Sequence, residues 1–294
     1  MRHDETRTGL IATLSAFIIW GFAPLFWMHL KHIPSAEVLA HRIAWSAPMA
    51  LALLWLRDRR FTELRALIHP APGVRRALLL STLLIAVNWF TFIWAVAHDR
   101  VTEASLGYYT NPLVNVVLGR IFLGERLSRL QWAAVGLAGL GVAWLALSMG
   151  TLPWVSLVLA FSFAFYGLVK KRAPVSPLTG IFVETGLWAP LCVAYLLAVP
   201  ETPWGALTRE GSTAALLVLS GAMTLGPLLL FAIGARRLPY STVGMLQYLA
   251  PTLQLAVAVL VFGEPFTSAH VVTFACIWGA VGLFVSGSRQ RRRS

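Results

Sequence analysis

The chain is a succession of long apolar runs separated by short polar stretches. Ten runs have about the 20 residues that a helix needs to cross a hydrocarbon core roughly 30 Å thick. They cover 9–30, 36–56, 75–97, 101–122, 128–147, 151–169, 176–199, 213–235, 241–262 and 269–287. None shows the strict alternation of a membrane β-strand. The pattern therefore predicts an all-α integral membrane protein with ten transmembrane helices.

The composition agrees with a membrane location. Of the 294 residues, 57% are hydrophobic and only 12% are charged. A soluble domain carries about twice that charged share. Cys192 and Cys276 both lie in apolar runs, so neither a disulfide framework nor a zinc site is expected.

The 24 Lys and Arg residues predict how the spans are oriented. With a cytoplasmic N-terminus, twenty of them fall at inner ends of spans, whereas only Lys31, Arg100 and Arg209 fall at outer ends. Membrane proteins concentrate Lys and Arg on the cytoplasmic side. Both termini are therefore expected in the cytoplasm. The formal charge of +12 is then a sign of topology, and no nucleic-acid partner is expected.

A repeated set of residues divides the chain into two halves. Tyr109-Thr110-Asn111-Pro112 matches Tyr248-Leu249-Ala250-Pro251, and Gly124-Glu125 matches Gly263-Glu264 at the same offset. Chance similarity between apolar segments is the alternative, but apolar runs do not commonly repeat Pro, Gly and Glu in register. The match predicts two units of five spans each, over 9–147 and 151–287.

Because five is an odd number of spans, the two units must lie in opposite orientations. Arg126 and Arg129 follow the inner Gly-Glu pair, whereas Pro265 and Ser268 follow its outer counterpart, as this orientation requires. Inverted repeats are a recurring architecture of secondary transporters, which bind substrate where the repeats meet and work by alternating access. The architecture therefore predicts, by analogy, a transporter of a small solute.

Several segments resemble those of RarD family permeases, which are EamA-domain transporters of the drug/metabolite transporter superfamily. These segments are Glu37–Ser46, Asn88-Trp89, Ala104–Tyr108, Asn111–Asn115 and Gln247–Thr252. The resemblance extends over about 9–285. It implies a permease or exporter of the bacterial inner membrane. The family is associated with chloramphenicol sensitivity, and it has no secure physiological substrate.

Prolines in two matching spans mark the first group of candidate site residues. Pro112 and Pro251 each remove a backbone donor and are expected to break their helices. The freed backbone must then line a cavity or find partners. Four amide side chains nearby would help to bind a polar substrate: Asn111, Asn115, Gln247 and Gln254. The alternative is a packing kink that neighbouring hydroxyl groups satisfy.

Ionisable residues inside the spans form the second group. Arg42 lies in the outer half of its span, where a charge is costly and needs a partner, and Glu37 and His41 share one helix face nearby. Glu103 lies at a similar depth, whereas Glu184 is nearer the inner side. One hypothesis is that Arg42 binds an anionic group while Glu37, His41 or Glu184 carries a coupling proton. The alternative is a structural ion pair.

Aromatic residues form the third group. Trp20, Tyr108, Tyr109 and Tyr248, together with Asn88-Trp89, would line a solute cavity. Their alternative role is to anchor helices at the membrane interface.

Small residues and two glutamates have simpler expected roles. Five glycines predict close helix packing, either within the bundle or in a homodimer: Gly136, Gly139, Gly141, Gly279 and Gly282. Glu125 and Glu264 are each expected to cap the N-terminus of the helix that follows.

The sequence lacks the signatures of several other functions. It has no phosphate-binding Gly-rich loop ending in Lys, and no motif for a metal or for an activated nucleophile. We expect no catalytic residue, metal or other cofactor, and only a small-molecule substrate and the lipid bilayer as partners. Transport would be driven by an ion gradient or by the solute's own gradient. The alternatives are an integral-membrane enzyme acting on a lipid-like substrate, or a membrane sensor.

Overall fold

The computed structural model describes residues 2–98, 100–148, 154–198, 211–263 and 267–293. All regular secondary structure in these ranges is helical. The elements are α1 (Arg2–Trp27), η1 (Met28–Leu30), α2 (Ser35–Arg57), α3 (Thr62–Ala66), α4 (Pro72–Ala97), α5 (Val101–Leu123), α6 (Arg129–Ser148), α7 (Trp154–Arg172), α8 (Pro177–Ala198), α10 (Gly211–Arg237), α11 (Tyr240–Gln247), α12 (Leu249–Leu260) and α13 (Ser268–Arg293). The all-α prediction is therefore confirmed for this part of the chain.

Nine helical segments in the described ranges are long and apolar enough to cross a membrane. Nine of the ten expected spans coincide with them, and the remaining span is α5. This helix has 23 residues, but polar side chains lower its hydropathy. Asn111 and Asn115 are only 2% and 0% exposed, so the polar face of α5 is turned towards protein rather than lipid.

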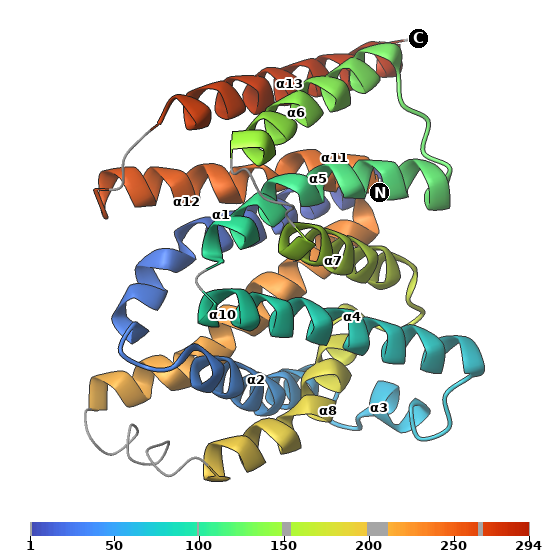
Figure 1. Cartoon of the computed structure of the whole chain (residues 1–294). Coiled ribbons are helices and arrows are strands. Elements are labelled where there is room, and N and C mark those ends of the chain that lie inside the picture. The colour runs from blue at the N-terminus through green and yellow to red at the C-terminus, as the bar shows by residue number, and fades with distance from the viewer. Residues whose placement is uncertain (1, 99, 149–153, 199–210, 264–266, 294) are drawn as a thin grey trace.

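The helices of the two halves pair with each other throughout the molecule (Figure 1). Helix α6 packs against α13, α2 against α8, and α5 against both α7 and α11. Helix α10 contacts α1 and α2, while α4 contacts α7 and α8, and α1 contacts α12. The helices of the first half, α1, α2, α4, α5 and α6, correspond in this order to α7, α8, α10, α11–α12 and α13 of the second half. When each helix in these pairs is replaced by its counterpart, the same set of pairs results. The two halves are thus interleaved rather than separate.

The largest apolar core lies where the halves meet. It includes Phe17 of α1, Ile85 of α4, Tyr166 of α7 and Phe231 of α10. Close backbone approach supports it, because a Cβ atom at Gly221 would lie only 2.6 Å from the Cβ of Trp45. Helices α2 and α10 can therefore pack this closely only with glycine at this position.

The five predicted packing glycines of α6 and α13 fall into two groups. A Cβ at Gly141 would lie 2.8 Å from Cys276, and one at Gly279 would lie 3.3 Å from Leu137, so these two confirm close packing within the bundle. The other three have no neighbouring heavy atom within 4 Å of an added Cβ: Gly136, Gly139 and Gly282. For them the expected close packing is wrong within this chain.

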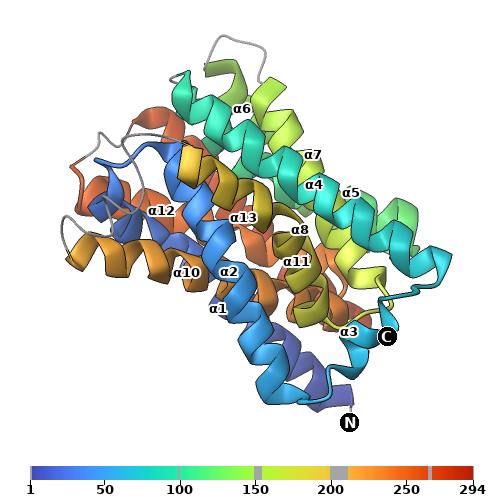
Figure 2. The same cartoon turned by 90° about the horizontal axis from the view of Figure 1, so that it is seen from below.

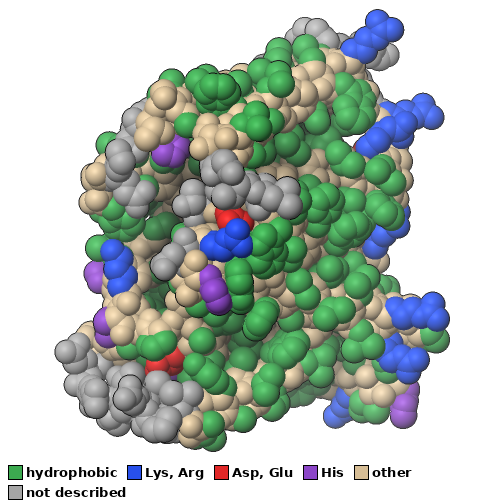
Figure 3. Space-filling model, in the orientation of Figure 1, with side chains coloured by type: hydrophobic (Ala, Val, Ile, Leu, Met, Phe, Trp, Pro, Cys, Tyr) green, Lys and Arg blue, Asp and Glu red, His purple; other side chains and the backbone are tan. Residues whose placement is uncertain are grey.

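The two termini lie at the same end of the molecule as α3 (Figures 1 and 2). Lys and Arg side chains gather along this end in the space-filling view (Figure 3). The connection between α2 and α4, which forms part of this end, contains the five-residue helix α3. The bundle therefore has a basic end, as the sequence predicts.

Candidate functional site

Buried amide side chains join α5 to α11, one helix from each half. Asn115 Nδ2 donates to Gln247 Oε1 at 2.8 Å and to Asn111 Oδ1 at 3.2 Å. Asn111 Nδ2 in turn donates to the carbonyl of Ala160 on α7 at 2.5 Å. Asn115 Oδ1 is buried without a partner. Three of the four predicted amide residues thus form one polar chain between the halves.

Of the two predicted helix breaks, the one at Pro112 is absent, and the one near Pro251 is present. Helix α5 runs without interruption through Pro112. The matching span is interrupted at Tyr248, between α11 and α12, three residues before Pro251. A proline ring clashes with the carbonyl four residues earlier, which here belongs to Gln247, the last residue of α11. The break in the second half is therefore explained, whereas in the first half α5 keeps its helix while packed between α7 and α11.

The two proline regions nevertheless lie against each other. The hydroxyl of Tyr109 donates to the carbonyl of Pro251 at 3.5 Å. A Cβ at Gly244 would lie 2.7 Å from the carbonyl oxygen of Pro112. Tyr248 is fully buried beside them, and its hydroxyl has no partner. Helices α5 and α11 therefore meet tightly at the predicted prolines.

Arg42 has neutral neighbours from three other helices. Its Nε donates to Thr224 Oγ1 of α10 at 2.9 Å, and its Cζ lies 4.8 Å from the ring centroid of Trp27, the last residue of α1. Tyr108 of α5 is close enough to interact electrostatically. The sequence indicated Arg42 and Tyr108. It did not single out Thr224, because threonine is common in membrane helices, or Trp27, because a tryptophan at the end of a span is typical of the membrane interface.

Glu37 and His41 form the pair expected from their spacing. His41 Nε2 lies 4.0 Å from Glu37 Oε1, and both side chains are buried. Glu37 Oε1 and both ring nitrogens of His41 have no hydrogen-bond partner. The pair is therefore close but not joined by a hydrogen bond.

Glu184 forms a buried ion pair with Lys170 of α7. Glu184 Oε1 accepts from Lys170 Nζ at 2.9 Å and from Ser81 Oγ at 2.6 Å, and Oε2 accepts from Tyr166 at 3.0 Å. Lys170 is not singled out by the sequence, because it begins a run of basic residues, and such a run indicates the cytoplasmic end of a span. The side chain is only 4% exposed, since the helix turns it inward.

The remaining candidates have separate contacts. Asn88 donates to the carbonyl of Leu159 and to Ser162, both at 3.0 Å, and Gln254 donates to the carbonyl of Trp20 at 3.0 Å. Trp89 packs at the edge of the main core. Glu103 forms an ion pair with Arg100 at 2.6 Å. These residues do not join the amide chain or the surroundings of Arg42.

Glu125 caps a helix, but not the one that follows it. Its carboxylate accepts the backbone N–H groups of Tyr240 and Ser241, which begin α11 in the other half. The expected local cap is therefore wrong, because the fold brings a different N-terminus closer. Its counterpart Glu264 lies outside the described residues.

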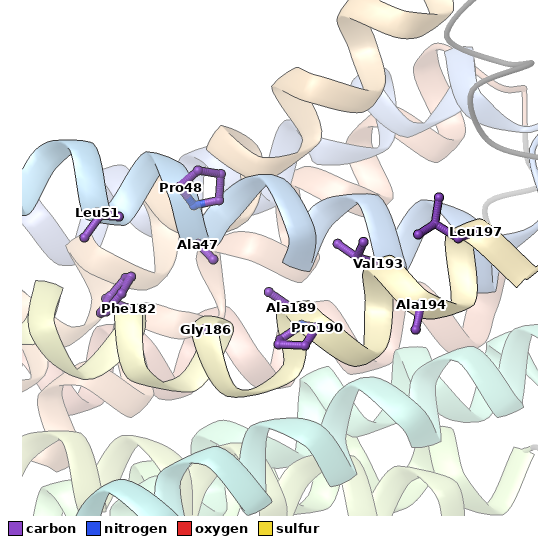
Figure 4. Close-up of a pocket in the computed structure, with 10 residues that line it drawn as sticks. All are labelled: Ala47, Pro48, Leu51, Phe182, Gly186, Ala189, Pro190, Val193, Ala194 and Leu197. Carbon is purple, nitrogen blue, oxygen red and sulfur yellow. The ribbon is translucent and has the colours of Figure 1, made fainter.

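An apolar groove of about 660 Å³ lies between α2 and α8, with Ala47 and Ala189 pointing into the space between the two helices (Figure 4). Leu51, Val193 and Leu197 line it and are substantially exposed on the outer surface. Its lining side chains carry no hydrogen-bonding group, so the groove is not suited to a polar solute. Among the described residues, no three His, Cys, Asp or Glu side chains are grouped to hold a metal ion.

The family model of the EamA-like transporter family matches the chain twice, over 7–147 and 152–286. The chain belongs to this family. Within it, the protein is 46% identical to "Uncharacterized transporter YojE" of Bacillus subtilis, over 100% of this chain and 99% of that protein. It is 43% identical to "Protein RarD" of Escherichia coli over the full length of both. It is also 34% identical to "Chloramphenicol-sensitive protein RarD" of Pseudomonas aeruginosa, over 93% of this chain and 92% of that protein.

The resemblance to RarD permeases is confirmed by these relatives. A solved crystal structure of another protein has a TM-score of 0.72, covers 96% of this chain and 97% of its own, and is 20% identical. At that identity the likeness shows the fold alone. Family membership and the apolar helices together make this EamA-family chain a multi-pass membrane transporter.

Proposed function

We propose that this chain moves a small solute across the bacterial inner membrane by alternating access of two inverted five-span repeats. Three observations support the repeat. The family model matches each half separately, at 7–147 and 152–286. The helix pairs are unchanged when the halves are exchanged. Both termini lie at the basic end, which requires an even number of crossings and favours α5 as a tenth span with cytoplasmic termini.

The observation that carries the transport mechanism is the buried contact between Asn115 and Gln247. Each half supplies one amide, and the contact lies beside the helix break at Tyr248. A polar group is costly inside a membrane protein unless it is satisfied or used. Asn115 Oδ1 is buried and has no hydrogen-bond partner among the described residues, so a free acceptor lies where the halves meet. Transporters bind substrate at such a repeat interface and alternate by moving one repeat against the other.

The driving force we propose is an ion gradient or the solute's own gradient. Glu37 and His41 are the buried titratable pair best placed to carry a coupled proton, because three of their polar atoms have no hydrogen-bond partner. This role is separate from that of Glu184, whose carboxylate oxygens are occupied by Lys170, Ser81 and Tyr166.

The test is uptake into proteoliposomes, with and without an imposed pH gradient. The labelled panel contains amino acids, small organic acids and chloramphenicol, which appears in a relative's name. We expect saturable uptake that falls at least about tenfold when Asn115→Leu is combined with Gln247→Met, because the double change removes both amides of the contact between the halves.

Gln131→Met provides the matched control. Gln131 is also buried, but it bonds to Ser288 between α6 and α13, away from the amide chain. Its uptake should remain near the wild-type rate. If folded wild-type protein takes up no member of the panel, the transport proposal is contradicted. If the amide double variant transports normally, the site is misplaced.

A further inference from the structure

Arg42 is a charged side chain inside a span without a charged partner. Its contacts among the described residues are Thr224 Oγ1, the ring of Trp27 and the nearby phenol of Tyr108. None of the ion pairs in this part of the chain includes Arg42. A cation within a membrane span normally pairs with an acid or lines a functional cavity. Within the described part of the chain, Arg42 therefore lacks the counter-charge that a structural role would supply.

Most of the hydrogen-bonding capacity of Arg42 is unused. A guanidinium has five N–H donors in a planar fork, and of these only Nε has an acceptor among the described residues. Arg42 is half-buried, and its Nη atoms are not among the buried atoms without a partner, so they remain accessible. Tyr108 beside it is 37% exposed. The free end of the fork therefore stays accessible near the phenol of Tyr108.

The position of Arg42 favours a solute over a lipid headgroup. Arg42 follows the first residue of α2 by seven positions, which places it about 10 Å along the helix. Its Nε points to α10, and the rings of Trp27 and Tyr108 come from α1 and α5. An arginine reaching for headgroups would extend towards the membrane surface instead. The guanidinium is thus enclosed by helices from both halves.

We infer that Arg42 binds the carboxylate of a small organic monoanion, with Trp27 and Tyr108 against the body of the molecule. The planar fork matches two carboxylate oxygens. One unpaired cation balances one negative charge, and Glu37 on the same helix disfavours a dianion. This inference rests on the proposed transport function and names its substrate class.

The experiment measures binding, so it is independent of transport. Purified full-length protein in lipid nanodiscs is titrated with acid and amide pairs: benzoate and benzamide, phenylacetate and phenylacetamide, and butyrate and butyramide. Binding is read from the shift in melting temperature. We expect at least one acid to stabilise the wild-type protein and its amide to have no effect. Arg42→Gln should weaken binding about ten- to hundredfold, and Arg42→Lys less, because it keeps the charge and loses the fork.

Two further measurements keep the result interpretable. Arg60→Gln, an exposed arginine at the basic end, should bind as the wild type does. Phenylglyoxal labelling of the wild-type protein, read by peptide mass spectrometry, should modify Arg42, and benzoate but not benzamide should protect it. This second readout needs no variant to fold.

Three results would overturn the inference: equal effects of acid and amide, unchanged binding in folded Arg42→Gln protein, or no binding and no protection by any acid. Acid binding without uptake in proteoliposomes would leave the Arg42 site intact and count against the transport proposal alone.

Discussion

Replacing Glu184 by Gln should strongly destabilise the protein. The Glu184 carboxylate is 2% exposed and accepts hydrogen bonds from Lys170, Ser81 and Tyr166, which join α8 to α4 and α7. A Glu184→Gln change leaves the Lys170 ammonium buried without its counter-charge. Glycine at position 180 leaves room for this cation, because a Cβ there would lie 2.7 Å from Lys170 Nζ.

The expected loss is about 3–5 kcal/mol, the range found when one partner of a buried ion pair is removed. Lys170→Met should cost less, because Ser81 and Tyr166 still donate to the carboxylate. The double change Lys170→Met with Glu184→Gln removes both charges, so it should recover to within about 1–2 kcal/mol of the wild type. The coupling energy in the double-mutant cycle is the sum of the two single losses minus the loss of the double variant, and it should therefore exceed about 2 kcal/mol.

Equilibrium unfolding in mixed micelles of detergent and SDS, followed by tryptophan fluorescence, measures these differences. Arg57→Gln is the control, because the Arg57–Glu63 pair has side chains 60% and 46% exposed and should contribute below about 1 kcal/mol. The reasoning fails if Glu184→Gln lies within about 1 kcal/mol of the wild type. It fails equally if the double variant loses as much as the two single variants added together.

Three further changes test the packing and the caps. Gly244→Ala would place a methyl group 2.7 Å from the carbonyl oxygen of Pro112. It should lower the free energy of unfolding by about 1–3 kcal/mol in the same assay. Gly139→Ala, with open space around the added methyl group, should not destabilise the protein. Glu125→Gln should cost about 0.5–2 kcal/mol by weakening the cap on α11, and an unchanged midpoint would show that the cap is not important. Burial raises the pKa of the Glu63 carboxyl, but hydrogen bonds from hydroxyl groups at the start of α8 outweigh it and lower the pKa below 4.5. The stability that the ionised Glu63 carboxylate contributes is therefore complete above pH 4.5 and is lost as the pH falls through the lower pKa of the folded protein. The melting temperature of Glu63→Gln should accordingly depend less on pH in that range than that of the wild type.

The cases of Pro112 and Pro251 show how far the sequence leads. The two prolines match in register, and the sequence therefore predicts that they break their helices alike. Only the second half is interrupted, at Tyr248, while α5 stays continuous between α7 and α11. A proline weakens a helix locally, but the helices packed around it decide whether the backbone turns.

The helical spans, the basic end and the polar residues within the spans can all be predicted from the sequence. These follow from local physics, because a bilayer demands apolar segments of a set length and lysine and arginine avoid crossing it. A contact between the amides of Asn115 and Gln247 could also be expected, because the two residues lie in matching spans.

Which polar groups become partners depends on how the helices pack in three dimensions. Lys170 pairs with Glu184 because α7 turns one residue of a basic run inward, and Glu125 caps a helix in the other half. Arg42 meets Thr224 and Trp27 instead of an acid. Such contacts join residues far apart along the chain, and their geometry depends on helix rotation and packing that no local pattern records.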